Sequence, residues 1–207
     1  WNEHPSLLSA LDDFDLRMAQ MGALLIHYRA HFVKRLQEAA PPIHRDFSGG
    51  GEELSLTYTT VSNIPDPLAS PKELLPLLLD HQARHKQAEL DSRQCLSGPH
   101  KDDLLVDING LSAKTYGSQG QTRTAALSLK LAQREIFQAE TEEWPVLLLD
   151  DVLSELDSSR QKYLLDGIHD IQTLITCTGL DDFVSHQFEI NKVFQVVKGH
   201  VYMPKGF

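Results

Sequence analysis

Two adjacent acids follow a run of aliphatic residues in the second half of the chain. Pro145 is followed by Val-Leu-Leu-Leu and then by Asp150 and Asp151, and residues 154–157 read Ser-Glu-Leu-Asp. A continuous aliphatic run predicts a buried parallel strand, whose carboxyl end faces the crevice where α/β sheets bind ligands. One acid can then hold a hard cation such as Mg²⁺ while the other faces a water molecule. The simpler alternative is that the acids merely end a strand and open a loop.

A second group of residues lies where a helix is predicted to begin. Ser118 and Gln121 have the spacing of a capping box, in which the serine hydroxyl accepts an orphan N–H and the glutamine reaches back to the cap. Gly120 in the same turn lowers the helix propensity and bares backbone N–H groups at the positive end of the helix dipole, an arrangement that favours an anion. The alternative is that these residues only mark the start of a helix.

Together, the two segments resemble the second half of an ABC-type ATPase head. In that family a Ser-Gly-Gln signature precedes a helix, an aliphatic strand then ends in a magnesium-binding acid and a catalytic acid, and a Ser-x-Leu-Asp loop follows. The order and spacing of these motifs match here. The resemblance implies nucleotide binding in trans for Ser118, Gly120 and Gln121, Mg²⁺ binding through the nucleotide for Asp150, catalysis for Asp151, and nucleotide contacts from the D-loop and switch regions for Asp157 and Thr178.

The segment Gly98-Pro-His-Lys-Asp-Asp103 narrows the resemblance. The signature reads Ser-Gln-Gly-Gln, and the segment with the two acids reads Leu-Asp-Asp-Val-Leu-Ser-Glu-Leu-Asp. With these motifs the chain resembles the RecF family, bacterial recombination-mediator ATPases that are related to SMC heads. The similarity is close over 98–178 and looser before it. It implies a cytoplasmic, ATP-dependent homodimer that binds double-stranded or gapped DNA and helps load recombinase with RecO and RecR in replication, repair and the SOS response.

Three departures from the family pattern affect the expected chemistry. Asp151 stands where transporter ATPases carry Glu, and its shorter side chain predicts slow hydrolysis. Gln119 replaces a signature glycine. No glycine in the sequence is followed by Lys and then Ser or Thr, so the P-loop that cradles phosphates is missing. We therefore expect the C-terminal portion of a longer slow ATPase that uses ATP and Mg²⁺, and no cofactor or activity in this chain alone.

The predicted fold is α/β, the C-terminal part of an ABC/SMC-type ATPase head with parallel strands and a helical arm subdomain. The Asn109-Gly110 pair predicts the turn of a β-hairpin. A strand, helix and strand around the two acids imply a right-handed parallel crossover. The predicted elements of this lobe are a hairpin over 103–116, a helix over 119–141, strands over 146–149 and 173–176 with a helix over 158–168 between them, and a closing hairpin over 193–203.

The first part of the chain predicts a long helix. From Ser6 to Ala40 apolar residues recur in steps of three and four, which is typical of a coiled-coil seam. The seam residues are Leu7, Leu11, Phe14, Met18, Met21, Leu25, Tyr28, Phe32 and Leu36. Pro41 and Pro42 and the glycines at 49–51 are expected to end this helix.

Such a seam needs a partner. A helix over 71–94, with Leu74, Leu75, Leu78 and Leu79 facing inward, is the candidate, and a projecting arm or lid is the alternative. Alternation over 54–60 predicts a half-buried strand. We expect a mainly helical arm over 1–97, from which the strand near 54–61 joins the head, and an ATPase lobe over 98–207.

Composition limits the remaining classes. The chain has 207 residues, 41% of them hydrophobic, and a net charge of −10, so it has no global attraction to nucleic acid and would bind DNA through a local patch or a missing part. Its apolar runs are far shorter than a membrane span, and no signal peptide follows Trp1. Cys95 and Cys177 lack the spacing of a disulfide framework or a zinc site, which fits a reducing cytoplasm.

Several histidines and basic residues fit bland roles better than functional ones. His81 and His85 have the spacing of a helical zinc pair, but a solvated helix face is favoured, because no third ligand is evident. The pair His27 and His31 is interpreted as structural, and His100 could cap a loop or lie near the nucleotide. The stripe of Arg84, Lys86 and Arg93 is read as a solvated face.

Two other functions stay open. One is a non-enzymatic interaction module that uses the heptad helix and carries a degenerate ATPase lobe. The other is a different SMC-like ATPase head.

Overall fold

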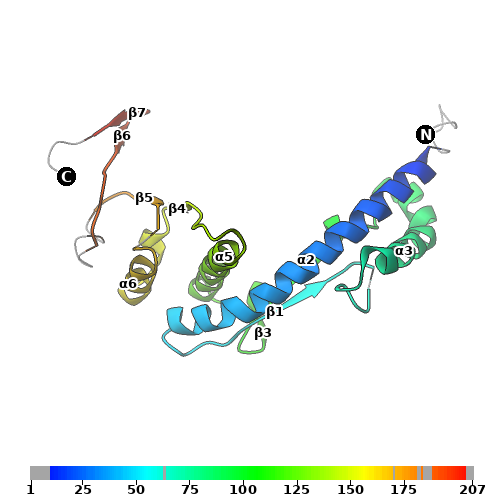
Figure 1. The fold of residues 1–207 in the computed structure, drawn as a ribbon, viewed down its shortest axis with the longest axis horizontal. Coiled ribbons are helices and arrows are strands. Elements are labelled where there is room, and N and C mark those ends of the chain that lie inside the picture. The colour runs from blue at the N-terminus through cyan, green and yellow to red at the C-terminus, as the bar shows by residue number, and fades with distance from the viewer. Residues whose placement is uncertain (1–9, 63, 170, 181–182, 184–187, 204–207) are drawn as a thin grey trace. The chain divides into compact units, whose positions relative to one another are not determined.

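The computed structural model describes residues 10–203 apart from positions 63, 170, 181–182 and 184–187 (Figure 1). Leu7, the first residue of the predicted seam, lies outside the described residues. The chain forms two compact units, residues 1–136 and 137–207. The predicted division into an arm over 1–97 and a lobe over 98–207 stays a prediction.

In chain order the elements are α2 (Leu11–Phe47), β1 (Leu54–Thr59), α3 (Pro71–Ser92), the 3₁₀ turn η1 (Pro99–Lys101), β2 (Asp103–Ile108), β3 (Leu111–Ser112), α4 (Ala113–Tyr116), α5 (Gln119–Thr141), β4 (Leu147–Asp150), the 3₁₀ turn η2 (Leu153–Glu155), α6 (Ser158–Gly167), β5 (Thr173–Thr176), β6 (Gln195–Val197) and β7 (His200–Tyr202). Among the described residues, no helix combines the length and apolar character that a membrane crossing requires.

Helix α2 is continuous through its two prolines, so the prediction that Pro41 and Pro42 end it is wrong. Each proline removes one backbone hydrogen bond and crowds the preceding turn, which disfavours a helix interior. Burial offsets this cost, because His44 and Phe47, one turn further on, are 0% and 3% exposed. The chain leaves the helix only where Gly49 adopts a positive φ of 69°.

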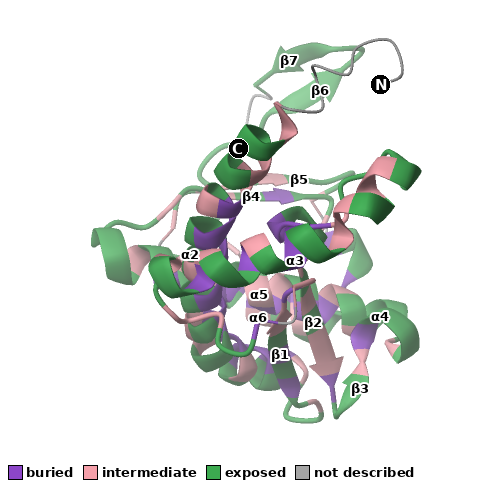
Figure 2. Ribbon diagram, turned by 90° about the vertical axis from the view of Figure 1, so that its right-hand side faces the viewer, coloured by how far each residue is buried: buried purple, intermediate pink, exposed green. Residues whose placement is uncertain are grey.

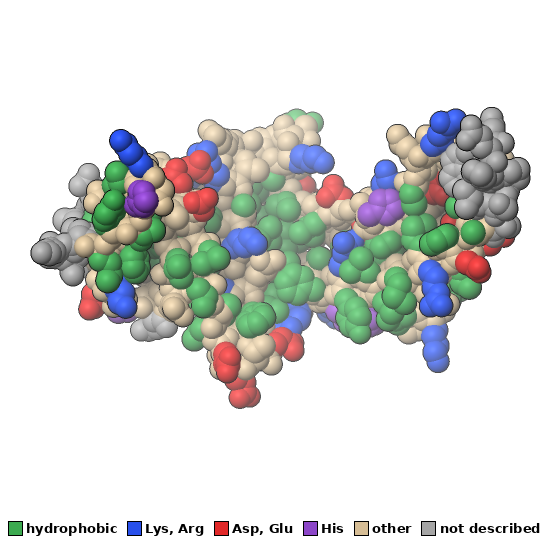
Figure 3. Space-filling view, turned by 90° about the horizontal axis from the view of Figure 1, so that it is seen from above, with side chains coloured by type: hydrophobic (Ala, Val, Ile, Leu, Met, Phe, Trp, Pro, Cys, Tyr) green, Lys and Arg blue, Asp and Glu red, His purple; other side chains and the backbone are tan. Residues whose placement is uncertain are grey.

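The outer stripe of α2, which we define as the exposed large residues of the predicted seam, does not face the core. These residues and their exposed fractions are Phe14 (70%), Met21 (57%), Leu25 (40%), Tyr28 (66%) and Phe32 (37%). The buried face is an adjacent row of mostly smaller residues with the same spacing of three and four, namely Ala19, Ala23, Ile26, Ala30 and Val33. The space-filling view shows hydrophobic side chains, in green, on the molecular surface among basic ones (Figure 3).

Helix α3 is the partner of α2, as predicted, although it packs on the buried face. Ser70 and Glu73 form a capping box at its start, and Pro71 occupies the first helical position. Leu74 and Leu78 then pack against the small residues of α2. A side chain at Gly22 would bring a Cβ to 3.1 Å from Pro99 Cδ, so glycine permits this close approach.

Strands β1, β2 and β3 form an antiparallel sheet in that order. Strand β1 pairs with β2 in full register, from Leu54 opposite Ile108 to Thr59 opposite Asp103. The predicted Asn109-Gly110 turn is confirmed, since both residues have positive φ values, 53° and 76°. The returning strand is shorter than predicted because residues 113–116 form helix α4.

The second unit contains a parallel strand pair. Strands β4 and β5 pair from Leu147 opposite Thr173 to Asp150 opposite Thr176, with α6 between them in the chain, which confirms a parallel connection. Leu149, Leu164 and Leu165 are buried in this unit. The closing hairpin is also confirmed, as β6 pairs antiparallel with β7. Both of its strands are exposed along their length (Figure 2).

Candidate nucleotide-binding site

The carboxyl end of the parallel pair holds the first predicted acid. Asp150 lies opposite Thr176 in the register, and the Thr176 hydroxyl donates a hydrogen bond to Asp150 Oδ1. The backbone N–H of Asp151 donates to the carbonyl oxygen of Thr176 at 3.2 Å and lies 3.0 Å from its hydroxyl. Both aspartates are exposed. The pair is therefore held at the end of the sheet and accessible to solvent.

Asp151 leaves the strand geometry. Its φ of 50° lies in the left-handed region, which short polar residues tolerate better than branched ones. The Ser154 hydroxyl donates to the Asp151 carbonyl oxygen at 3.0 Å and holds the following turn. The two acids consequently differ in backbone conformation, since Asp150 is the last strand residue and Asp151 begins a turn.

The D-loop aspartate is the N-cap of α6. Asp157 Oδ1 accepts the backbone N–H of Arg160 at 3.1 Å, and the Arg160 guanidinium donates to Oδ2 at 2.6 Å. These hydrogen bonds, above all the one from the backbone, lower the pKa of Asp157 below its usual value. The preceding turn is held by Gln161, whose side chain donates to the Leu153 carbonyl oxygen at 2.9 Å. Thr178 is exposed two residues after β5.

The signature residues form the start of α5, and the capping box is confirmed. The Gln121 backbone N–H donates to Ser118 Oγ at 3.2 Å, and the Ser118 backbone N–H donates to Gln121 Oε1 at 3.0 Å. A Cβ added at Gly120 meets no atom of the described residues within 4 Å, so the local fold leaves room for a side chain there. At Gly117 the same Cβ would lie 2.5 Å from the Ala113 carbonyl oxygen, so that glycine is required by packing.

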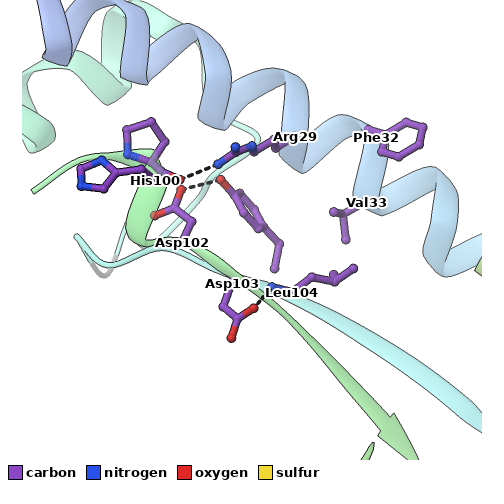
Figure 4. Close-up of a pocket in the computed structure, with 9 residues that line it drawn as sticks. Arg29, Phe32, Val33, His100, Asp102, Asp103 and Leu104 are labelled. Carbon is purple, nitrogen blue, oxygen red and sulfur yellow. Dashed lines mark hydrogen bonds between the residues drawn. The ribbon is translucent and has the colours of Figure 1, made fainter. Parts of the chain in front are cut away.

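The Gly-Pro-His segment is braced by residues far away in the sequence (Figure 4). Asp102 accepts the Tyr58 hydroxyl at 2.6 Å and the Val61 backbone N–H at 3.0 Å, and Arg29 donates to the Pro99 carbonyl oxygen. Burial and the hydrogen bond to Asp102 raise the pKa of Tyr58 well above its usual value. The brace borders a pocket of about 250 Å³, and the exposed His100 is one of its lining residues. No spacing in the sequence indicates this contact set.

The histidine pairs have other roles. His81 is buried and its Nδ1 lies 3.1 Å from Ser97 Oγ, so the prediction of a solvated face is wrong for this residue. His27 Nδ1 lies 2.9 Å from the Ala69 carbonyl oxygen, a structural contact as predicted. Within the described ranges, no three His, Cys, Asp or Glu side chains gather as metal ligands. The prediction of a solvated face holds for Arg84 and Arg93, which are exposed. Lys86 is only partly exposed and forms an ion pair with Asp12 of α2.

The site residues therefore fall into two groups. Asp150, Asp151, Asp157 and Thr178 belong to the second unit, and the signature turn belongs to the first. The exposed oxygens of Asp150 fit a hard cation, and Mg²⁺ is commonly bound by one or two carboxylates together with substrate phosphates. The start of a helix is the positive end of its dipole, so the first turn of α5 suits an anion.

Comparisons with known proteins agree on one family. No protein-family model matches the chain. Three curated relatives are DNA replication and repair proteins RecF, from Agathobacter rectalis (45% identical over 197 residues), Lachnospira eligens (40% over 196) and Clostridium tetani (39% over 198). They match 94–96% of this chain, which spans 51–53% of their length.

Solved structures show the same fold. A structure of the recombination mediator protein RecF-ATPrS in the RecFOR pathway matches with a TM-score of 0.80 and 33% identity, over 94% of this chain and 50% of that one. A RecF-ATP structure matches with a TM-score of 0.78 over 95% and 52%. The fold is thus that of the C-terminal portion of the RecF ATPase, and the chain belongs to the RecF family, spanning about half the length of its curated relatives.

Proposed function

We propose that this chain supplies the signature side and the Walker B-type acids of an ATP site in a recombination mediator that acts on DNA in replication and repair. The similarity to RecF supports the process, and the neighbours described as RecF-ATPrS and RecF-ATP support the nucleotide. The alternative of another SMC-like head fits these relatives less well.

The observation that carries the proposal is the open signature turn. Ser118 and Gln121 hold the first turn of α5 through reciprocal hydrogen bonds, and Gly120 between them leaves the surface free of a side chain. Glycine costs about 1 kcal/mol in a helix relative to alanine. Because no neighbouring atom requires glycine at this position, close approach of a phosphate group explains the residue better than packing does.

The acids have separate roles in this proposal. Asp150, held by Thr176, binds the metal together with the nucleotide phosphates, and Asp151 positions water for slow hydrolysis. Mg²⁺, when bound, neutralises charge on the phosphates and supplies Lewis-acid assistance. Asp157 shapes the D-loop as a helix cap, and Thr178 senses the γ-phosphate from its exposed position two residues after β5.

At the level of the whole protein, the signature of one protomer closes a nucleotide held by the other. The resulting ATP-dependent dimer binds double-stranded or gapped DNA and acts with RecO and RecR in the cytoplasm to load recombinase, and slow hydrolysis reopens it. One of the matching structures is of RecF in the RecFOR pathway, which supports these partners. The chain lacks the Gly-Lys-Ser/Thr sequence, so we propose that by itself it neither binds ATP appreciably nor hydrolyses it.

The test uses this chain with full-length RecF of Agathobacter rectalis. Tagged chain is mixed with that RecF, with or without ATP and Mg²⁺, and retention of RecF on the tag is measured. We expect retention only with ATP, and its loss in Ser118→Arg. Ser92→Arg, at the exposed end of α3, is the matched control. Equal ATP-dependent retention by Ser118→Arg and the unmodified chain would show that the signature does not act in trans.

The outer stripe of α2 favours a second candidate, a non-enzymatic interaction module. Five large apolar side chains along one exposed helix face are typical of a surface that binds another protein. If this surface binds RecF, retention of RecF is independent of ATP and is lost when Tyr28 is replaced by Glu, while Ser118→Arg has no effect. The same retention assay therefore separates the two candidates.

A further inference from the structure

We infer that His44 is a positioning residue for the signature turn, through a polar connection that runs from Glu52 to Gly120. It passes through three buried residues, His44, Ser128 and Thr124. All five residues lie in the first compact unit. The functional meaning of this connection rests on the proposed function, because that proposal makes the Gly120 turn a binding element.

The connection consists of four contacts. His44 Nε2 lies 3.1 Å from Glu52 Oε2, and its Nδ1 lies 3.2 Å from Ser128 Oγ. The Ser128 hydroxyl donates to the carbonyl oxygen of Thr124 at 2.7 Å, and the Thr124 hydroxyl donates to the carbonyl oxygen of Gly120 at 2.8 Å. His44, Thr124 and Ser128 are all 0% exposed. The centre of the connection is therefore shielded from solvent.

The direction of the hydrogen bonds fixes one proton. A serine hydroxyl has a single hydrogen, and that of Ser128 points to Thr124, so Ser128 Oγ accepts from His44 Nδ1. His44 Nε2 lies beside the carboxylate of Glu52, whose side chain is 14% exposed.

The four-residue spacing of Gly120, Thr124 and Ser128 extends the connection along α5 to its first turn. Gly120, Thr124 and Ser128 are separated by four residues each and lie on one row of the helix. Hydroxyl groups that bond to the carbonyl four residues earlier are common in helices and by themselves are local. Here the row begins at a histidine of another helix and ends in the signature turn. The end of α2 after its two prolines is thereby joined to the first turn of α5.

Substitutions at Thr124 separate positioning from simple packing. Thr124→Val keeps the shape of the side chain and removes the hydroxyl, whereas Thr124→Ser keeps the hydroxyl and removes a methyl group. Amide hydrogen exchange of the chain is followed by NMR at Gln121 and Thr122, whose N–H groups bond to Ser118. We expect Val to raise these two exchange rates about five- to tenfold and Ser to leave them within about twofold.

The matched control is at the other end of the same helix. The Thr141 hydroxyl donates to the Phe137 carbonyl oxygen at 3.0 Å, a bond of the same kind in the last turn. Thr141→Val should leave exchange at the signature turn unchanged. If Thr124→Val and Thr124→Ser raise exchange equally, the side chain acts through packing alone and the inference is overturned.

The His44 end has its own spectroscopic signature. In chain labelled with ¹⁵N at histidine, we expect a protonated Nδ1, and Ser128→Ala should shift that resonance and loosen the signature turn as Thr124→Val does. An unprotonated Nδ1, or a turn indifferent to Ser128→Ala, would contradict the connection.

The retention assay then separates this inference from the proposed function. If exchange behaves as expected but no variant alters RecF retention, the connection exists and the trans-signature proposal fails. If retention depends on Ser118 but exchange ignores Thr124→Val, the positioning role fails alone.

Discussion

Thr176 donates its hydroxyl to the carboxylate of Asp150 across the parallel pair of strands. The same threonine accepts the backbone N–H of Asp151 through its carbonyl oxygen. One residue of β5 therefore orients the first acid and holds the turn that begins at the second.

The hydroxyl of Thr176 gives the first test. In Thr176→Val the shape of the side chain is kept while Asp150 loses its donor. A hydrogen bond of this kind contributes about 0.5–1.5 kcal/mol, so exchange of the Asp151 amide should accelerate roughly three- to tenfold. Thr173→Val is the control on the same strand, since the Thr173 hydroxyl donates to the Ile171 carbonyl oxygen instead. Equal acceleration in both variants would mean that strand pairing is affected generally.

Two glycines near the signature should respond in opposite directions. Gly120→Ala adds a methyl group in open space and should stabilise the chain by up to about 1 kcal/mol, because alanine favours the helix. Gly117→Ala forces a Cβ toward the Ala113 carbonyl oxygen and should destabilise it. Urea unfolding measures both changes. Under the proposed function, Gly120→Ala also weakens ATP-dependent retention of RecF, so stability and function change in opposite senses.

The N-cap of α6 should make stability depend on pH. The folded state lowers the pKa of Asp157 below the ordinary 3.8, so its charged form contributes stability above that pH, and the contribution disappears as pH falls through the lower folded pKa. Asp157→Ala should cost about 0.5–2 kcal/mol at pH 7. Asp157→Ser retains a neutral cap, and the difference between it and the unmodified chain should vanish in acid. A difference in urea unfolding that persists at pH 2 would contradict this origin.

The prolines of α2 offer a test of helix continuity. Pro42→Ala restores a backbone donor inside the helix and should raise the unfolding free energy by about 1–3 kcal/mol. Pro71→Ala is the control, because proline is favoured at the first position of α3 and its loss should bring no gain. Thermal unfolding compares the two. An equal effect of both substitutions would indicate that α2 is interrupted at Pro42.

The face of α2 that packs is tested by two truncations. Ile26→Ala removes a side chain that is 0% exposed and should cost about 2–5 kcal/mol. Tyr28→Ala lies in the outer stripe and should change stability by about 0.5 kcal/mol or less. Urea unfolding of the two variants should therefore rank them clearly. A larger loss at Tyr28 would restore the predicted seam as the packing face.

The local elements around the chemistry were predictable because their signals are local. The aliphatic run before Asp150, the Asn109-Gly110 turn and the Ser118–Gln121 box each act within a few residues, and the structure contains all three. Parallel pairing followed from the order of strand, helix and strand.

The packing face of α2 was not predictable in the same way. On two adjacent faces of that helix, apolar residues recur in steps of three and four. The face with the larger residues was the predicted packing face, but the other face is the buried one. Ala19, Gly22 and Ala23 form the buried face because small side chains let α3 approach closely. Hydrophobicity alone gives more weight to Phe14 and Tyr28.

Contacts between distant residues left no signal at all. His44 and Ser128 are 84 positions apart, and Tyr58 and Asp102 are 44 apart. Nothing in the spacing of these residues indicates that they meet. The continuity of α2 through Pro41 and Pro42 has no local signal either, since the burial that offsets the two prolines comes from the rest of the fold.

The parallel strand pair has a consequence for how the chain behaves in solution. Leu148 and Leu174 lie opposite each other and are 71% and 54% exposed. One face of the β4–β5 strand pair therefore exposes apolar side chains to solvent. The net charge of −10 makes molecules of this chain repel one another, and this repulsion opposes aggregation. Salt shortens the reach of that repulsion, to about 10 Å at 0.1 M and 3 Å at 1 M. We therefore expect the chain to aggregate least in dilute, low-salt solution at a pH above its isoelectric point.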